Sequence, residues 1–176
     1  MTNPDLRFRR AKKSDAAVLA EFGARTFQET FGARNSPRDM AAYLASNYGV
    51  LQQAAQLEDP NIITLVSEAE GQLAAFAQVR RQSPPESLKA EMSVELWRFY
   101  VDSPWQGHDV AQRLMEQVNA AADELGGQII WLSVWERNER AIAFYKKSGL
   151  RIAGTKEFWL GSDLQTDYLM TLEVAR

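Results

Sequence analysis

The stretch that decides the fold runs from Glu95 to Ala111 and reads ELWRFYV, then DSPW, then QGHDVA. Its first part is rich in aromatic and apolar residues and predicts a β-strand over Val94 to Val101. Beyond Asp109, apolar residues recur at helical spacing and predict a helix over Val110 to Leu125. Free backbone N–H groups and the positive end of the helix dipole meet where such a helix begins, and both favour a phosphate or pyrophosphate. A turn with the single glycine Gly107 is more typical of a plain tight connection, so this stretch alone leaves both interpretations open.

The segments after this helix complete a β-α-β unit. An apolar run over Ile129 to Trp135 predicts a second strand, and because a helix connects it to the first, the two strands are expected to be parallel neighbours. A further helix is predicted from Asn138 to Ser148, with Gly149 at the position that follows its end. Two β-rich runs then predict a closing antiparallel pair around Gly161: Phe158, and Tyr168 to Val174.

The segments before the stretch alternate between helical and strand patterns. Ser14 is placed as the N-cap of a first helix, and a second helix is predicted from Ser36 to Asn47 with Pro37 at its first position. The other expected segments are a strand over Leu6 to Ala11, a connection over Phe27 to Asn35, a hairpin of Ile62 to Ser67 with Leu73 to Val79, and a loop over Gln82 to Ser93.

The composition indicates one ordinary globular domain over residues 1–176, with 45% apolar and 24% charged residues. The chain has no cysteine and only one histidine, His108, so we expect no disulfide, no thiolate nucleophile and no metal cofactor. The formal net charge of −3 lacks the basic excess that is typical of nucleic-acid or membrane binding. Since no signal-like or membrane-spanning apolar run occurs, we expect a cytoplasmic protein, and a homodimer is left open.

A second motif begins at the end of the second predicted strand, where residues 134–150 read VWERNERAIAFYKKSGL. Together with the first stretch, it resembles the cofactor-binding half of the GNAT acetyltransferase superfamily. The pattern of that superfamily is a strand, a Gln/Arg-x-x-Gly-x-Gly/Ala turn and an Asn-x-x-Ala-x-x-Phe-Tyr helix. Other segments resemble the PaiA-type bacterial polyamine acetyltransferases: Thr26 to Phe31, Asn35 to Pro37 with Met40, Tyr43 and Leu44, and Gln165 to Asp167. The resemblance covers nearly the whole chain, least of all the loop around Pro84 and Pro85.

This resemblance implies an α/β (α+β) GNAT fold: a mixed, mostly antiparallel sheet with one splayed parallel strand pair and flanking helices. It also implies acetyl-CoA as co-substrate, with its pyrophosphate on the N–H groups of the turn and its pantetheine paired with the splayed strand like an added strand. An N–H of that strand would stabilise the oxyanion of the thioester carbonyl. The residues assigned to the cofactor are Phe99, Tyr100 and Val101 on the strand, Gln106, Gly107, His108, Asp109, Val110 and Ala111 in the turn, Asn138, and Lys147 for the 3′-phosphate.

Catalytic roles are carried over from the same resemblance. Tyr145 matches the tyrosine that protonates the departing thiolate or hydrogen-bonds to the thioester sulfur, although a packing role also fits its type and spacing. Asn138 also fits a helix N-cap. A base is needed because an aliphatic amine with a pKa near about 10 is protonated at neutral pH. Glu95 is the first candidate, because several GNAT enzymes carry a glutamate at this strand position; a solvated edge charge is the alternative. The acceptor side is assigned Phe27, Phe31, Glu29, Glu91 and Asp167, the three carboxylates being rival bases or partners of a distant ammonium group.

One position departs from the family pattern. Asp109 stands where the pattern has its first glycine, and a carboxylate there adds bulk and like charge beside a pyrophosphate. It weakens cofactor binding, unless it turns outward or caps the helix with its own side chain and leaves the backbone amide free to bind phosphate. The preferred hypothesis is direct acetyl transfer to a primary amine of a polyamine such as spermidine or spermine. The alternatives are a non-catalytic GNAT-fold regulator or binding module, and an acetyltransferase for an antibiotic amine or a protein N-terminus.

Overall fold

The computed structural model describes residues 6–175, which form one seven-stranded sheet with α-helices on both faces. The strands are β1 (Arg7–Arg10), β2 (Ile62–Ala69), β3 (Gln72–Arg80), β4 (Ser93–Val101), β5 (Ile129–Trp135), β6 (Arg151–Leu160) and β7 (Asp163–Glu173). The α-helices are α1 (Ala16–Phe31), α2 (Pro37–Asn47), α3 (Val50–Glu58), α4 (Val110–Glu124) and α5 (Glu139–Lys147).

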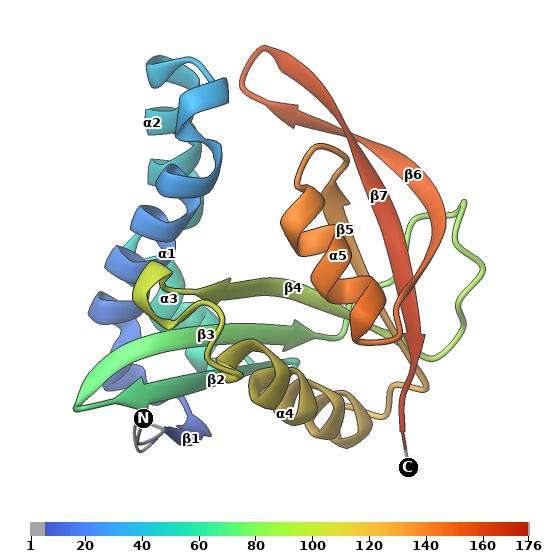
Figure 1. The fold of residues 1–176 in the computed structure, drawn as a ribbon, viewed down its shortest axis with the longest axis horizontal. Coiled ribbons are helices and arrows are strands. Elements are labelled where there is room, and N and C mark those ends of the chain that lie inside the picture. Colours follow the sequence, from blue (N-terminus) through green and yellow to red (C-terminus); the bar gives the residue numbers. More distant parts are fainter. Residues whose placement is uncertain (1–5, 176) are drawn as a thin grey trace.

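The order of the strands confirms the expected sheet. It is β1-β2-β3-β4-β5-β7-β6, and every neighbouring pair is antiparallel except β4 and β5, which α4 connects. In Figure 1, α1 and α2 stand on one side of the molecule, the β6–β7 hairpin stands on the other, and α5 lies between them. This arrangement leaves the junction of β4 and β5 near the centre of the molecule.

Apolar side chains cover both faces of the sheet. On one face, α4 buries Val110, Leu114 and Val118 at helical spacing and packs against β2 and β3. On the other face, Phe22 of α1 meets Phe76 of β3 with ring centroids 5.8 Å apart. The sheet is therefore a central layer between helices, as alternating strands and helices predict.

Two predictions for the first third of the chain are wrong. The expected connection over Phe27 to Asn35 is helical for its first part, because α1 continues to Phe31 and is followed by a 3₁₀ turn over Gly32–Arg34. Phe27 is buried against Tyr43 of α2, and this aromatic contact stabilises the extra helical turn. Ser14 lies inside a 3₁₀ turn rather than at the N-cap of α1, a position that Asp15 occupies. Helix α3 (Val50–Glu58) was not predicted from the sequence.

The turn between β6 and β7 approaches the beginning of α2. The hydroxyl of Ser162 donates to the Asp39 carboxylate at 3.1 Å, and Gly161 has a φ of +62°. A Cβ on Gly161 would lie 2.2 Å from the Asp39 Cγ atom, so only glycine fits this position. This contact connects the β6–β7 hairpin to α2, and these two elements stand on either side of α5.

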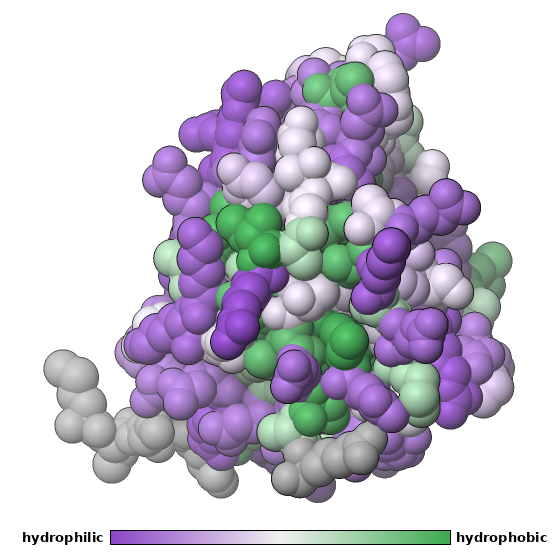
Figure 2. Space-filling view, turned by 90° about the vertical axis from the view of Figure 1, so that its right-hand side faces the viewer, coloured by the Kyte–Doolittle hydropathy of each residue, from purple (hydrophilic) through white to green (hydrophobic). Residues whose placement is uncertain are grey.

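The β6 side of the molecule has a mixed surface. Figure 2 shows apolar atoms that reach this surface in separate places among hydrophilic side chains. On β6 and β7, the large apolar residues that are exposed are Ile152, Trp159 and Leu164. No helix within residues 6–175 is long and apolar enough to cross a membrane.

Candidate active site

Strands β4 and β5 pair only over their first residues and then separate. The parallel pairing joins Ser93 to Glu95 with Ile129 to Trp131, whereas β5 continues along β7 as far as Trp135 and β4 continues along β3 as far as Val101. Each strand therefore follows its antiparallel partner, and a gap opens between them. This confirms the splayed parallel pair that the family resemblance implied.

The gap exposes backbone groups of β4. The N–H of Asp102 donates to the Ala74 carbonyl of β3 at 2.9 Å. Because successive N–H groups of a strand point to opposite edges, the N–H groups of Phe99 and Val101 face the gap, and that of Tyr100 faces β3. The Tyr100 hydroxyl lies 2.7 Å from the Tyr48 hydroxyl, so both the backbone N–H and the side-chain hydroxyl of Tyr100 are engaged away from the gap.

The turn before α4 has the geometry of an anion site. Gly107 and Asp109 both have positive φ angles, +87° and +58°, and no described carbonyl or side chain accepts a hydrogen bond from the N–H groups of residues 107–112. These groups lie at the positive end of α4, which is held in place by the fully buried Val110. The donors fit a pyrophosphate, which is the cofactor group expected here.

The Asp109 side chain does not cap α4. Asp109 occupies the N-cap position in the left-handed conformation and makes no side-chain cap hydrogen bond, so the alternative of a capping carboxylate is wrong. A capping side chain needs extended backbone, whereas this turn requires a positive φ. The family glycine is explained by the same requirement, and aspartate is one of the few residues that tolerate this conformation.

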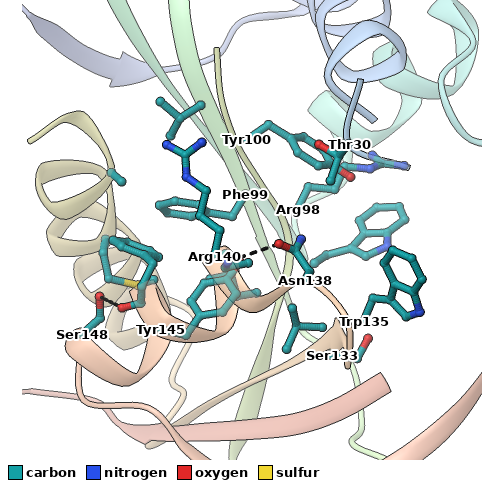
Figure 3. Close-up of a pocket in the computed structure, with 18 of the residues that line it drawn as sticks. Thr30, Arg98, Phe99, Tyr100, Ser133, Trp135, Asn138, Arg140, Tyr145 and Ser148 are labelled. Atoms are coloured by element: carbon teal, nitrogen blue, oxygen red, sulfur yellow. Dashed lines mark hydrogen bonds between the residues drawn. The ribbon is translucent and has the colours of Figure 1, made fainter. Parts of the chain in front are cut away.

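Helix α5 forms the second side of the gap (Figure 3). The Asn138 Oδ1 accepts from the Ala141 N–H at 3.2 Å, which confirms the N-cap interpretation and leaves the amide nitrogen free to face the cleft. Tyr145 is buried with its ring centroid 6.2 Å from that of Phe99, and burial raises the pKa of its hydroxyl, which is therefore protonated at neutral pH. Lys147 lies on the same helix and also lines the cleft.

Arg140 is a residue that the sequence analysis missed. Its side chain extends from α5 along the cleft in Figure 3 and bonds the Gln106 side chain, whose amide also donates to the Val101 carbonyl at 2.9 Å. The sequence did hold a signal for Arg140: it is a cation two residues after Asn138, at the start of a helix that faces the anion-binding turn. His108, by contrast, is exposed beside Trp105 and is not among the side chains that line the cleft.

Aromatic side chains from distant segments form the wall on the α1 and α2 side. Phe27 stacks on Tyr43 at 4.6 Å, Phe31 contacts Trp135 at 5.8 Å, and Tyr43 contacts Phe158 at 6.0 Å between ring centroids. Phe27 and Phe31, which were both assigned to the acceptor side, line the cleft together.

Glu95 is buried and held by an arginine. Its carboxylate accepts from the Arg80 Nε at 2.5 Å. The Arg80 guanidinium lies 3.8 Å from the centroid of the Trp97 ring, which also meets the Arg98 guanidinium at 4.0 Å. The alternative of a solvated edge charge is therefore wrong, because Glu95 belongs to a buried ion pair beside a stacked tryptophan.

The three rival carboxylates lie in different surroundings. Glu29 is exposed on α1 and paired with Arg25, which also bonds Asp102. Glu91 does not reach the main cleft and lines a separate hollow beside Arg81 and Pro84. Asp167 on β7 is 6% exposed and lines the main cleft, and burial raises the pKa of its carboxyl.

One continuous cleft of about 1190 Å³ contains the turn, the gap, Tyr145, the aromatic wall, Glu95 and Asp167. A donor site for an anion and an aromatic site for a second ligand thus meet at the gap between β4 and β5. Such a cleft brings two substrates together for group transfer.

The comparisons with known proteins agree with this arrangement. Residues 25–150 match the model of the Acetyltransferase (GNAT) family. An uncharacterized N-acetyltransferase from Mycobacterium tuberculosis is 32% identical over 161 residues, which cover 92% of this chain and 99% of that protein.

Two solved structures share the fold. The PaiA N-acetyltransferase from Thermoplasma acidophilum in complex with coenzyme A has a TM-score of 0.78 at 17% identity and covers 96% of this chain and 99% of its own. The yncA protein from Salmonella typhimurium with acetyl-CoA has a TM-score of 0.69 at 20% identity and covers 98% of this chain and 95% of its own. Because the family model spans well over half of the residues and the mycobacterial relative covers nearly the full length, this chain belongs to the GNAT family of acetyltransferases.

Proposed function

We propose that this chain acetylates a primary amine of a small cation, of the kind that a polyamine such as spermidine or spermine presents. Family membership makes the chain an N-acetyltransferase that uses acetyl-CoA as co-substrate. The observation that carries the proposal is the single cleft in which an anion-binding turn, a gap with free strand N–H groups and an aromatic wall are continuous. No covalent enzyme intermediate is needed, because both substrates fit the same cleft.

The cofactor is assigned to the α4 and α5 side of the gap. The N–H groups of residues 107–112 would hold the pyrophosphate, and those of Phe99 and Val101 would pair with pantetheine or stabilise the oxyanion. Arg140 and Lys147 add positive charge on the opposite side, Lys147 being the residue proposed for the 3′-phosphate. The bound thioester supplies the activated acetyl carbon.

Tyr145 is proposed as the proton donor to the departing sulfur. Tyr145 lines the cleft, and burial keeps its hydroxyl protonated because the phenolate would be poorly solvated there. A neutral donor is useful only when negative charge develops on sulfur, so its contribution is expected in turnover rather than in binding.

The acceptor is assigned to the α1 and α2 side. A polyamine has apolar methylene segments between ammonium groups, and the wall of Phe27, Phe31 and Trp135 suits both parts through apolar contact and cation–π attraction. Glu29 and Asp167 offer carboxylates for a distant ammonium group.

An acetylation screen tests the proposal. The acceptors are diamines, spermidine, spermine, aminoglycosides and peptides, with release of free CoA thiol as the readout. The proposal is supported if the diamines and polyamines have the highest kcat/KM. If aminoglycosides or peptides have the highest kcat/KM, the acceptor class in the proposal is wrong. A protein that is stabilised by acetyl-CoA in a thermal shift but acetylates nothing would indicate the non-catalytic binding module.

Two lesser parts of the proposal concern the surroundings of the enzyme. A homodimer is supported by the edge strand β6, which exposes Ile152 and Trp159. Light scattering of the purified chain would test it. The cytoplasmic location stays a prediction.

A further inference from the structure

The acceptor amine needs a group that removes its proton before it can attack. An ammonium group with a pKa of about 10 is only about 0.1% deprotonated at pH 7. The rate at neutral pH therefore depends on a base that removes this proton. We infer that this base is the carboxylate of Asp167 and that Glu95 is a positioning residue. The inference rests on the proposed function, because it concerns the same amine and the same cleft.

The contacts of Glu95 argue against its use as the base. Its carboxylate is 5% exposed and accepts from Arg80, the side chain that stacks on Trp97. A proton taken up by Glu95 would leave the Arg80 guanidinium without its partner in a mostly buried site, which is costly. Glu95 therefore holds Arg80 against Trp97 and so shapes the floor of the acceptor site.

Asp167 is buried without a charged partner in hydrogen-bond contact among the described residues. It is paired across the sheet with Trp135 of β5 and with Lys156 of β6, and paired residues point to the same face. Trp135 contacts Phe31 of α1, so this is the acceptor face. The carboxylate thus lies beside the aromatic wall, where the amine is proposed to bind.

The position of Asp167 relative to Tyr145 suits direct transfer. Val134 belongs to the apolar cluster that includes Tyr145, so Ser133 and Trp135, its neighbours on β5, point to the opposite face with Asp167. The proposed base and the proposed acid therefore lie on opposite faces of the sheet, and the gap between β4 and β5 connects them. An amine that enters from one face attacks the acetyl carbon while the sulfur leaves on the other.

The electrostatic surroundings of Asp167 favour proton uptake. Burial raises the pKa of its carboxyl and the charge of Glu136 adds to this, whereas Lys156 and the Ser133 hydroxyl lower it. Tyr43 of α2 is the further titratable group near it, and burial raises the pKa of Tyr43 to about 12, so its hydroxyl is neutral. A carboxylate whose pKa is raised is a stronger base than an exposed carboxylate. The difference in pKa between the carboxyl and the ammonium group is therefore smaller, and proton transfer is less unfavourable.

The proton and electron balance is simple. Asp167 takes one proton from the ammonium group, and the free nitrogen lone pair forms the bond to the acetyl carbon. The carbon–sulfur bond breaks, its electron pair leaves with sulfur, and Tyr145 donates a proton to that sulfur. The nitrogen loses its second proton, which restores Tyr145 through solvent, and Asp167 releases its own proton to solvent.

The test compares Asp167→Asn with Glu95→Gln and with the matched control Glu157→Gln, an exposed carboxylate on the neighbouring strand that does not line the cleft. The substrate is the best acceptor of the wild-type screen, and kcat/KM is measured from pH 6 to pH 10. We expect Asp167→Asn to lower kcat/KM at pH 7 by about 100-fold or more, and by less than about tenfold at pH 10, where free amine is abundant. Glu95→Gln should lower the rate with the wild-type pH profile, and Glu157→Gln should change neither.

Folding and cofactor binding are followed in the same variants. Calorimetric titration should give the same CoA affinity for Asp167→Asn as for the wild type, and Asp167→Ser serves as a second variant if the amide disturbs folding. A wild-type rate and profile in a folded Asp167 variant would overturn the inference, as would a pH-dependent loss found only in Glu95→Gln. If the wild type acetylates no amine at all, the proposed function fails instead, so the two failures are distinguishable.

Discussion

Replacing Asp109 by glycine is expected to tighten CoA binding by about fivefold to tenfold. Asp109 is exposed in the turn, its side chain makes no cap hydrogen bond, and the N–H groups beside it are the proposed pyrophosphate donors. A negative charge about 6 Å from a phosphate, screened by an effective dielectric of about 50, costs on the order of 1 kcal/mol. That free energy corresponds to a factor of about five in Kd, and a pyrophosphate carries more than one charge.

The free energy of unfolding should not rise with this substitution. Glycine removes the penalty of a φ of +58°, which is at most about 1 kcal/mol for aspartate. Two terms oppose this gain: the larger unfolded-state entropy of glycine, about 0.5–1 kcal/mol, and the loss of a negative charge at the beginning of α4, about 0.3–1 kcal/mol. A tighter complex would therefore come from the turn itself and not from a more stable protein.

Asp109→Asn is the matched control, because asparagine tolerates the same left-handed conformation without the charge. Calorimetric titration of CoA into both variants at two salt concentrations is the assay. If Asn reproduces the gain and added salt reduces it, charge repulsion was the cause; a gain confined to Gly indicates side-chain bulk or backbone freedom. Equal or weaker binding in both variants would refute the argument.

Three other changes test the site and its support. Tyr145→Phe should lower kcat by about tenfold or more while the Kd of CoA stays within about twofold, because the hydroxyl acts when charge develops on sulfur; an unchanged kcat removes Tyr145 from the chemistry. Gly161→Ala should lower the free energy of unfolding by about 1–3 kcal/mol in urea denaturation, since its Cβ would meet Asp39 at 2.2 Å, and the added change Asp39→Ala should recover part of the loss. Arg98→Leu should cost about 2–4 kcal/mol in the same assay, because it removes the donor to the buried Gln78 side chain and to the Asn47 carbonyl; an unchanged midpoint would contradict this.

The cofactor half of the site was predictable because its determinants are local. The helix pattern from Val110, the N-cap at Asn138 and the C′ glycine at Gly149, whose φ is +94°, are each set by a few consecutive residues. The gap between β4 and β5 was foreseen from the resemblance, and the structure shows its cause in the two antiparallel partners that draw the strands apart.

The acceptor half depends on contacts between distant segments and was predicted less well. The aromatic wall joins Phe31 of α1 to Trp135 of β5, which are more than a hundred residues apart. The burial of Asp167 follows from its place between β5 and β6 and near Tyr43 of α2, and nothing in its own neighbours along the chain indicates it. The family resemblance placed Glu95 first, and Asp167 was left as a rival.

The pairing of Glu95 with Arg80 is another contact that the sequence does not show. Regular alternation would place Glu95, Trp97 and Phe99 on one face of β4. A bulge interrupts the register, with Leu96 opposite Val79 and Arg98 opposite Gln78, so that Trp97 is an extra residue. Beyond the bulge the faces are exchanged: Arg98 now shares the face of Glu95, and Phe99 turns to the Tyr145 side. One inserted residue therefore directs the Phe99 N–H to the gap and brings Trp97 between the Arg80 and Arg98 guanidinium groups. Arg80, held against Trp97 in this way, is the ion-pair partner of Glu95.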